Sequence, residues 1–393
     1  MPTLDTLSWY SLSIPLYGAF LALEWALGRR ESRAVFSFNE TISNLTAGLG
    51  TMLLGIFAGP WVLRAWDWTH AHLAPLRWPS QGLWRYPAAL VLADFCYYAY
   101  HRAGHRLAVF WAIHGIHHQH EHLNSTVGFR LEWFADPYAA LFFGLMPLAG
   151  VDSSTGFTAI AALSVYALLA HCPVFRWPSL GLLVTPAVHG AHHSRDARYA
   201  GKNFSAMLAV WDRLLGTWSE PPAGEELRRD VPSVARTHDG VSAQWGLVVE
   251  LAQRLRASGS VASALRTLTS EPVLRSAPEP RDDHSVPRAV RAHVLPQFLG
   301  LAVVAAWLLW FRGERAVLVT LSAMAAVLLG LHSLGALLDG RPGAEARERL
   351  RLLATALVGA ALLGSAPFAG LALLAAAVLG LAASPLRTPR TAP

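Results

Sequence analysis

The 393-residue sequence is poor in charge, since Asp, Glu, Lys and Arg together make up only 15% of it. A soluble domain usually carries about 25% charged residues. Hydrophobic residues make up 53% of the chain, and several apolar runs approach the roughly 20 residues that a helix needs to cross a bilayer. These proportions exclude an ordinary soluble domain and predict a polytopic membrane protein.

Cysteine is equally scarce, with only Cys96 and Cys172, both in or beside apolar stretches. Two such residues form neither a disulfide framework nor a CxxC metal site. The sequence also lacks a phosphate-binding loop, a dinucleotide fingerprint and an HExxH motif. Its net charge of +6 fits arginine anchoring at an anionic leaflet. No soluble basic face with interleaved aromatic residues is present, so nucleic acid is not an expected partner.

The apolar runs of near-spanning length are Trp9–Leu27, Thr41–Leu63, Tyr86–Tyr100, Val294–Phe311 and Ala316–Leu338. The run Leu352–Ser384 is too long for one span, so we predict that Gly364–Pro367 breaks it into a hairpin. Arg29, Arg30 and Arg33 follow the first run, which places this loop in the cytosol by the positive-inside rule. The third run then ends at the cytosolic face. For the shorter stretches 136–151 and 157–170, a re-entrant hairpin and a full crossing both remain open.

Histidine is abundant where the third run ends. Eleven of the 17 histidines lie between residues 101 and 193. HRAGH places two at i and i+4, while HGIHH and HGAHH each place three at i, i+3 and i+4. Residues three and four apart share one face of an α-helix, so each motif presents its imidazoles in one direction. The predicted metal ligands are His101, His105, His114, His117, His118, His189, His192 and His193, with His171 as a ninth.

Imidazole is a ligand of iron, zinc, copper and nickel. A structural zinc ion takes four ligands, so eight or nine histidines suit two ions better than one. Two adjacent metals with nitrogen ligands and no thiolate favour a redox pair, and iron is the expected metal. A membrane zinc-dependent hydrolase is one alternative, but it would need a general-base glutamate as in HExxH. A metal transporter or sensor is another, but it would place ligands at mid-membrane across several spans.

Polar residues near the histidines are candidates for supporting roles. Asp94 lies seven residues before His101, on the same helix face, where it could accept an N–H from a ligating imidazole. Asp212, beside Arg213, is either a structural ion pair or a similar support. Asn124 and Asn203 follow the second and third motifs. An aromatic set either lines a substrate groove or faces lipid: Trp111, Phe129, Trp133, Phe134, Phe142 and Phe143.

At these residues the sequence resembles the fatty acid hydroxylase/sterol desaturase superfamily, whose hallmark is HxxxH followed by two HxxHH motifs. The resemblance covers roughly residues 88–218, through DFCYYAYHRAGH, WAIHGIHH, LLAHCPVFRWP, TPAVHGAHHSRDARYAGKNF and WDRLLGTW. Departures are Gln119-His120 after the second motif, where relatives often carry Ser or Asn, and Val188, where many carry a further histidine. These departures leave the metal core unchanged and the substrate open.

The resemblance implies a di-iron centre that uses O₂ to hydroxylate or desaturate a lipid, either a fatty acyl chain, a sterol or an ether lipid. It implies that the nine histidines are iron ligands and that Asp94, Asn124, Asn203 and Asp212 occupy polar positions similar to recurrent ones in the family. Electrons must come from outside, from a ferredoxin, a cytochrome or reductase, or a reduced pterin. The C-terminal spans are similar in architecture to those of the pterin-dependent alkylglycerol monooxygenases.

The expected fold is therefore an all-α, polytopic membrane helical bundle with a cytosolic histidine-rich di-metal site and an additional C-terminal helical bundle. We predict N-terminal membrane spans at residues 1–85 and the hydroxylase-like catalytic region at 86–220. A cytosolic cap and linker should follow at 221–290, and a transmembrane bundle with few functional side chains at 291–393.

Overall fold

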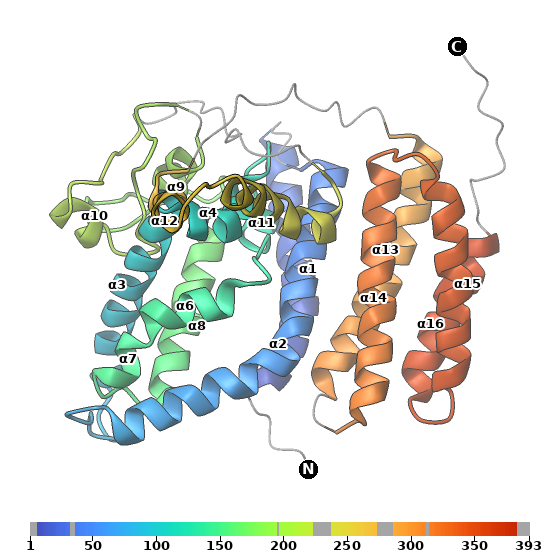
Figure 1. The fold of residues 1–393 in the computed structure, drawn as a ribbon, viewed down its shortest axis with the longest axis horizontal. Coiled ribbons are helices and arrows are strands. Elements are labelled where there is room, and N and C mark those ends of the chain that lie inside the picture. The colour runs from blue at the N-terminus through green and yellow to red at the C-terminus, as the bar shows by residue number, and fades with distance from the viewer. Residues whose placement is uncertain are drawn as a thin grey trace.

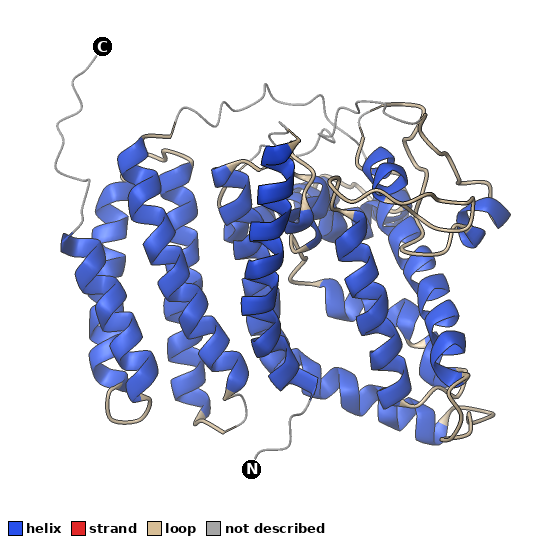
Figure 2. Cartoon of the chain, turned by 180° about the vertical axis from the view of Figure 1, so that it is seen from behind, coloured by secondary structure: helices blue, strands red, loops and turns tan. Residues whose placement is uncertain are grey.

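The computed structural model describes residues 6–31, 36–194, 196–222, 237–272, 286–311 and 314–382. Within these ranges the secondary structure is helical and no β-strand forms, which confirms the predicted all-α class (Figure 2). The first half contains α1 (Thr6–Arg30), α2 (Phe38–His72), α3 (Arg85–Arg106), α4 (Ala108–His114), the 3₁₀ helix η1 (Gly115–His118), α5 (Ser125–Gly128), α6 (Ala135–Phe143), α7 (Leu145–Leu148), α8 (Ser153–Ala170), α9 (Pro186–His192) and α10 (Val210–Leu214). The second half contains α11 (Gly240–Arg256), α12 (Val261–Thr269), α13 (Arg288–Trp310), α14 (Val317–Leu338), α15 (Ala344–Leu362) and α16 (Pro367–Ala382).

The helices form two neighbouring groups that run in the same general direction (Figure 1). One group holds the long helices α1, α2, α3 and α8, with the short helices α4, α9, α11 and α12 gathered at one end. The other is a bundle of α13 to α16. A shared core joins them, because Leu49 and Leu53 of α2 pack in the same hydrophobic cluster as Leu301 of α13 and Leu331 of α14.

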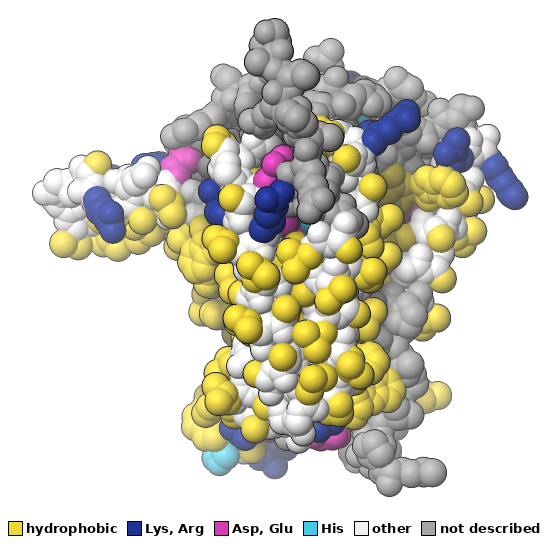
Figure 3. All heavy atoms as spheres, turned by 90° about the vertical axis from the view of Figure 1, so that its right-hand side faces the viewer, with side chains coloured by type: hydrophobic (Ala, Val, Ile, Leu, Met, Phe, Trp, Pro, Cys, Tyr) yellow, Lys and Arg dark blue, Asp and Glu magenta, His cyan; other side chains and the backbone are white. Residues whose placement is uncertain are grey.

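Four helices in the described part of the chain are long and apolar enough to cross a membrane: α2, α8, α13 and α14. The stretch 157–170, left open by the sequence, therefore belongs to a helix of spanning length. The predicted run Tyr86–Tyr100 does form a helix, α3, but is not among the four, because α3 also carries Asp94, His101 and His105. On the outer side of the bundle, hydrophobic side chains form a band between charged ends (Figure 3). The protein is thus an integral membrane protein.

Helix α2 does not cross the membrane in a straight line. Its 35 residues would extend about 52 Å, which exceeds the roughly 30 Å hydrocarbon thickness of a bilayer. Pro60 lies inside the helix and cannot donate the backbone hydrogen bond of a regular turn. The helix bends, and its second half runs crosswise below the upright helices in Figure 1. Trp61 and Trp68 are exposed there, as expected of tryptophans at a membrane interface.

The C-terminal bundle confirms one prediction. The long apolar run breaks as predicted, since α15 ends at Leu362 and α16 begins at Pro367. The bundle also contains a buried polar network. Buried Glu348 lies 2.9 Å from His293 Nε2, accepts a hydrogen bond from Ser333 and pairs with Arg351. Buried charges need such partners, so this network joins α13, α14 and α15.

Candidate metal centre

All nine predicted histidines gather at one end of the first helix group. His101 and His105 lie on the last turns of α3, while α4 and η1 carry the second motif. His171 follows α8 directly, and α9 carries the third motif. The rings touch across elements, with centroids 4.4 Å apart for His101 and His192 and 4.2 Å apart for His171 and His189. Segments that are 92 residues apart in sequence thus form one cluster.

Eight of the nine histidines fall into two groups of four, and in each group the candidate ligand atoms lie within 4.8 Å of one another. The first group is His101, His105, His118 and His192, and the second is His117, His171, His189 and His193. His114 belongs to neither group, although its Nε2 lies 3.2 Å from Nε2 of His118. Two adjacent nitrogen-rich sites are the arrangement that the histidine count predicted.

The second group has the electrostatics of a site built around a cation. Nδ1 of His171 lies 2.7 Å from the Ala167 carbonyl and Nδ1 of His117 lies 3.4 Å from the Arg130 carbonyl. A carbonyl only accepts, so each Nδ1 carries the proton and each Nε2 a lone pair. Yet the two Nε2 atoms are 3.1 Å apart, which is repulsive unless a cation lies beside both. Metal–nitrogen bonds of about 2.1 Å bring ligands at right angles to about 3.0 Å.

The first group has buried nitrogen atoms that find no protein partner. Nε2 of His101, His105 and His192 and Nδ1 of His118 are buried without a hydrogen bond among the described residues. Buried polar atoms of this kind are rare and need an explanation such as an ion. The opposite Nδ1 atoms of His101 and His192 each lie 2.8 Å from a backbone carbonyl, of Phe204 and Lys202 respectively. These contacts fix the ring orientation and leave Nε2 available.

Burial also keeps these imidazoles neutral. It lowers the pKa of His171 to about 4 and the pKa of His192 to about 3, because the charged form loses its hydration. A metal binds the neutral imidazole, so no proton has to be displaced at neutral pH. The donor set, its burial and its protonation therefore all fit metal binding.

Asp94 lies beside the site but does not accept a hydrogen bond from an imidazole, so that prediction is wrong. Its carboxylate accepts from the backbone N–H groups of Met207 and Leu208, at 2.9 and 3.0 Å, and from Trp211 Nε1 at 3.0 Å. A carboxylate with three donors already satisfied has no need of the ring. Asp94 instead fastens the chain after residue 203 to α3.

Asp212 supports the same segment from the other side. It accepts hydrogen bonds from the backbone N–H groups of Phe204 and Ser205, at 2.9 and 2.8 Å, and from the Thr217 hydroxyl at 2.7 Å. Since the Phe204 carbonyl holds His101, Asp212 orients this imidazole through one peptide unit. The ion-pair alternative is not what the structure shows, because the guanidinium of Arg213 lies over the Trp218 ring.

We expect Asp212→Asn to weaken metal binding about 10- to 100-fold, the usual range for groups that orient ligands. The amide would turn one N–H toward a backbone N–H, leaving a buried donor unpaired and costing about 1–3 kcal/mol of stability. Metal titration and thermal unfolding of the purified protein measure both effects. Asp67→Asn, on an exposed position of α2, is the control. Equal metal affinity in the two variants would contradict the role given to Asp212.

The side chains of the two predicted asparagines hold backbone groups near the site. Asn203 has a positive φ of 59°, which asparagine tolerates better than most residues. Its side chain bridges the Val188 carbonyl and the backbone of Ser219, so it ties α9 to the segment after α10. Asn124 caps α5 by accepting from the Thr126 N–H at 3.0 Å.

One residue at the site was missed by the sequence analysis as a functional group. Glu132 is buried and accepts from Nδ1 of His114 at 2.7 Å. Its signal was a carboxylate inside an otherwise apolar LEWF segment. His120, which follows the second motif, is also buried, and its Nε2 lies 2.9 Å from Nδ1 of His193.

The predicted aromatic set packs within the protein in several places. Trp111 stacks on the His118 ring at 5.7 Å. Phe142 packs edge-on against Tyr100, and Tyr100 in turn meets the His114 ring at 6.3 Å. Aromatic surface therefore adjoins the histidine rings on the side of α3, α4 and α6.

The fold and the site define a polytopic membrane protein with a buried centre of nine histidines. Residues 86–217 match the family model for fatty acid hydroxylase, which confirms the resemblance to the fatty acid hydroxylase/sterol desaturase superfamily. This part of the chain is thus similar to fatty acid hydroxylase domains.

Three relatives illustrate the similarity. Alkylglycerol monooxygenase of Danio rerio is 26% identical over 358 residues, which covers 86% of this chain and 79% of the relative. The ornithine lipid hydroxylase OlsE of Rhizobium tropici is 32% identical over 39% of this chain and 46% of its own length. Methylsterol monooxygenase erg25A of Aspergillus fumigatus is 29% identical over 36% of this chain and 48% of its own length. The chain thus spans less than half of the latter two relatives. No solved structure matches it.

Proposed function

We propose that this protein is a non-haem di-iron monooxygenase that hydroxylates a C–H bond of a membrane lipid, with O₂ as co-substrate and electrons from an external donor. The observation that carries the proposal is the pair of four-histidine groups. The Nε2 atoms of His117 and His171 face each other without a proton between them, and the first group holds four buried nitrogens without a partner among the described residues. Two iron ions held there would supply the oxygen activation needed to attack an unactivated C–H bond.

The residues of the chain have three tasks in this proposal. The Nε2 atoms of His101, His105 and His192 are directed into one group, while the carbonyls of Phe204 and Lys202 hold the first and last of these rings. Such orientation raises metal affinity because little freedom is lost on binding. Burial of the rings excludes water, which favours reaction with the lipid over side reactions. The aromatic surface at Trp111 and Phe142 is the proposed neighbour of the substrate chain.

An alkylglycerol is the substrate class to test first. The match to the alkylglycerol monooxygenase of Danio rerio covers 86% of this chain, so it extends beyond the hydroxylase-like region. The matches to the ornithine lipid hydroxylase and the methylsterol monooxygenase cover less than half of the chain. All three are named as hydroxylases or monooxygenases, which favours hydroxylation. The relative named a sterol desaturase is 25% identical over 38% of the chain, and desaturation is the second candidate reaction.

The histidine end of the molecule is proposed to face the cytosol. The end of α1 and the start of α15 lie at this end of the fold (Figure 1) and carry Arg29, Arg30 and Arg347. Arginine-rich loops remain on the cytosolic side of a membrane. A ferredoxin, a cytochrome or reductase, or a reduced pterin could reach the site from there.

The test is to purify the full-length protein in detergent from cells grown on ⁵⁷Fe and to measure metal content and Mössbauer spectra. We expect about two irons per chain with a coupled di-ferric signal. Supplying an alkylglycerol, ¹⁸O₂ and each electron donor in turn should give a lipid product with one ¹⁸O atom. Zinc without iron, even after iron-rich growth and anaerobic reconstitution, would overturn the proposal in favour of a hydrolase.

A further inference from the structure

Helix α11 packs on α4 and η1 through Leu247 and Ala243, and its side chain Gln244 reaches the segment beside the histidine centre. This residue is 4% exposed. Its Oε1 accepts from the backbone N–H of Trp133 at 3.0 Å, and its Nε2 donates to the carbonyl of Leu131 at 3.1 Å. The two backbone groups flank Glu132, whose carboxylate lies 2.7 Å from Nδ1 of His114. One carboxamide therefore holds both sides of the residue that orients this imidazole.

The segment that Gln244 holds is an irregular one, which Arg130 and Trp133 also anchor to α2. Residues 129–134 connect α5 to α6 and belong to no regular element. A buried backbone N–H or carbonyl without a ladder partner needs one from elsewhere. Only an amide side chain offers a donor and an acceptor together at this reach, because glutamate cannot donate at neutral pH.

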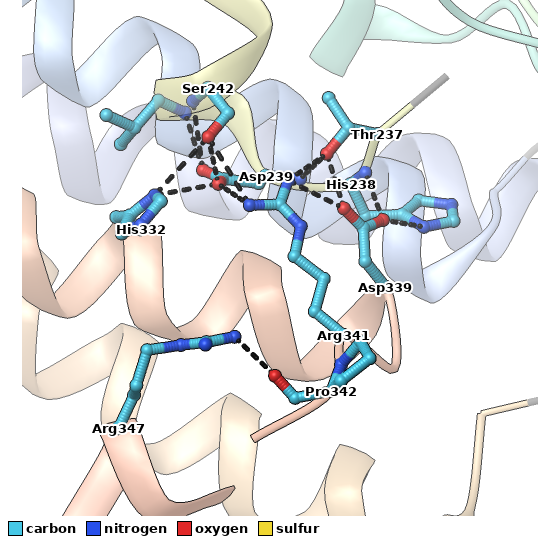
Figure 4. Close-up of polar contacts among 10 residues, drawn as sticks. Thr237, His238, Asp239, Ser242, His332, Asp339, Arg341, Pro342 and Arg347 are labelled. Carbon is cyan, nitrogen blue, oxygen red and sulfur yellow. Dashed lines mark hydrogen bonds and ion pairs between the residues drawn. The ribbon is translucent and has the colours of Figure 1, made fainter. Parts of the chain in front are cut away.

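Helix α11 is in turn fastened to the C-terminal bundle at its N-cap residue. Asp239 caps α11 and is fully buried. Its carboxylate lies 2.7 Å from His332 Nδ1 and 3.0 Å from Arg341 Nη1, which belong to α14 and the loop after it (Figure 4). The neighbouring His238 N–H donates to Asp339 at 2.8 Å. The contact therefore has several bonds, all to the end of α14.

The N-terminal end of α11 packs closely against α14 and α2. A Cβ at Gly335 of α14 would lie 2.3 Å from Cα of Asp239, and a Cβ at Gly240 would lie 2.6 Å from the Ser43 carbonyl of α2. Glycine at both positions lets α11 fit between α14 and α2. From Asp239 to Gln244 the helix rises about 7.5 Å, less than two turns. A displacement of the end of α14 would therefore also displace Gln244.

We propose that Gln244 is a positioning residue for the histidine centre and that the C-terminal bundle keeps it in place through Asp239. The inference rests on the proposed metal centre. It gives the bundle a role in the site. The end of α14 fixes the position of α11, and Gln244 of α11 fixes the segment that holds Glu132. Glu132 then fixes the orientation of the His114 ring.

The test is a Co²⁺ titration of the metal-free, full-length protein in detergent, read by the visible absorption of bound cobalt. Gln244→Ala and the equal-sized Gln244→Glu should stay folded by circular dichroism, bind cobalt about 10- to 100-fold more weakly and show altered bands. Arg341→Ala, in the bundle, should change the bands in the same direction. Gln253→Ala, on an exposed position of α11, should match the wild type.

A double variant tests the route through Glu132. If Gln244 acts through this residue, Glu132→Gln/Gln244→Ala should bind cobalt within about threefold of the weaker single variant, because coupled residues are not additive. If the loss of cobalt affinity in the double variant equals the product of the two single losses, the route through Glu132 is wrong. Wild-type cobalt affinity and bands in both Gln244 variants would overturn the proposal, as would failure of both to fold. Absence of metal binding in the wild type would instead defeat the proposed function.

Discussion

Replacing His105 with alanine is expected to remove one metal ion from the centre, and replacing His189 with alanine is expected to remove the other. The two residues belong to different four-histidine groups, so each loss should leave the other group with its four nitrogens. Hydroxylation needs both ions in the proposed function, and each variant should lose activity by at least about 100-fold. Elemental analysis should find about one iron per chain in each variant, and Mössbauer spectroscopy should show an uncoupled ion.

His72→Ala is the matched control, because His72 is exposed and its ring lies against the carbonyl and the indole ring of Trp68 in its own helix. It should keep both irons and full activity. Loss of both ions from each single variant would show that the two groups act as one site. Retention of both ions with normal activity would remove His105 and His189 from the ligand set.

The histidine motifs predicted which residues would meet, but not how they would be divided. In HGAHH, His189 and His193 join one group while His192 joins the other. Positions i and i+4 differ by about 40° around a helix, whereas i+3 lies about 60° to the other side. In the second motif His117 and His118 lie in a 3₁₀ helix and also fall in different groups, while His114 joins neither. The two adjacent histidines of an HH pair thus belong to different metal sites. The spacing predicts this division only if two sites are already assumed.

The supporting residues were harder to predict because they act through the backbone. Asp94 and Asp212 were singled out correctly as polar residues near the site, but both hold main-chain N–H groups of residues 204–208. The groups that contact His101 and His192 directly are carbonyls. A carbonyl is present at every residue, so no side-chain pattern in the sequence identifies those that orient a ring.

Helices of spanning length were predicted well where hydrophobicity was the main signal. The hairpin break before Pro367 and the spans in α13 and α14 follow from composition. Helix α3 was less certain, because it combines apolar residues with the polar side chains of the site. The connection between α11 and the bundle could not be predicted, since Asp239 and Arg341 are 102 residues apart and neither stands in a recognisable motif.

Arg130 is the residue whose loss should most disturb the fold around the centre. It is 1% exposed and makes several hydrogen bonds to neutral groups. Nε donates to the Ile116 carbonyl at 2.7 Å, and Nη1 donates to Ser43 and Asn44 of α2 at 2.8 and 3.0 Å. Burial lowers its pKa to about 10, so it stays charged at neutral pH. The backbone carbonyl of Arg130 accepts a hydrogen bond from Nδ1 of His117.

Arg130→Met should therefore destabilise the protein by about 3 kcal/mol or more, because three buried acceptors lose a donor at once. Methionine fills much of the space, so the loss reports the hydrogen bonds more than a cavity. Denaturant unfolding in detergent, followed by circular dichroism, measures the change against Arg256→Met at the exposed end of α11. Metal affinity should fall as well, since Ile116 lies between His114 and His117 and would lose its anchor to α2. Unfolding of Arg130→Met at the same denaturant concentration as the control would show that water replaces the guanidinium at no cost.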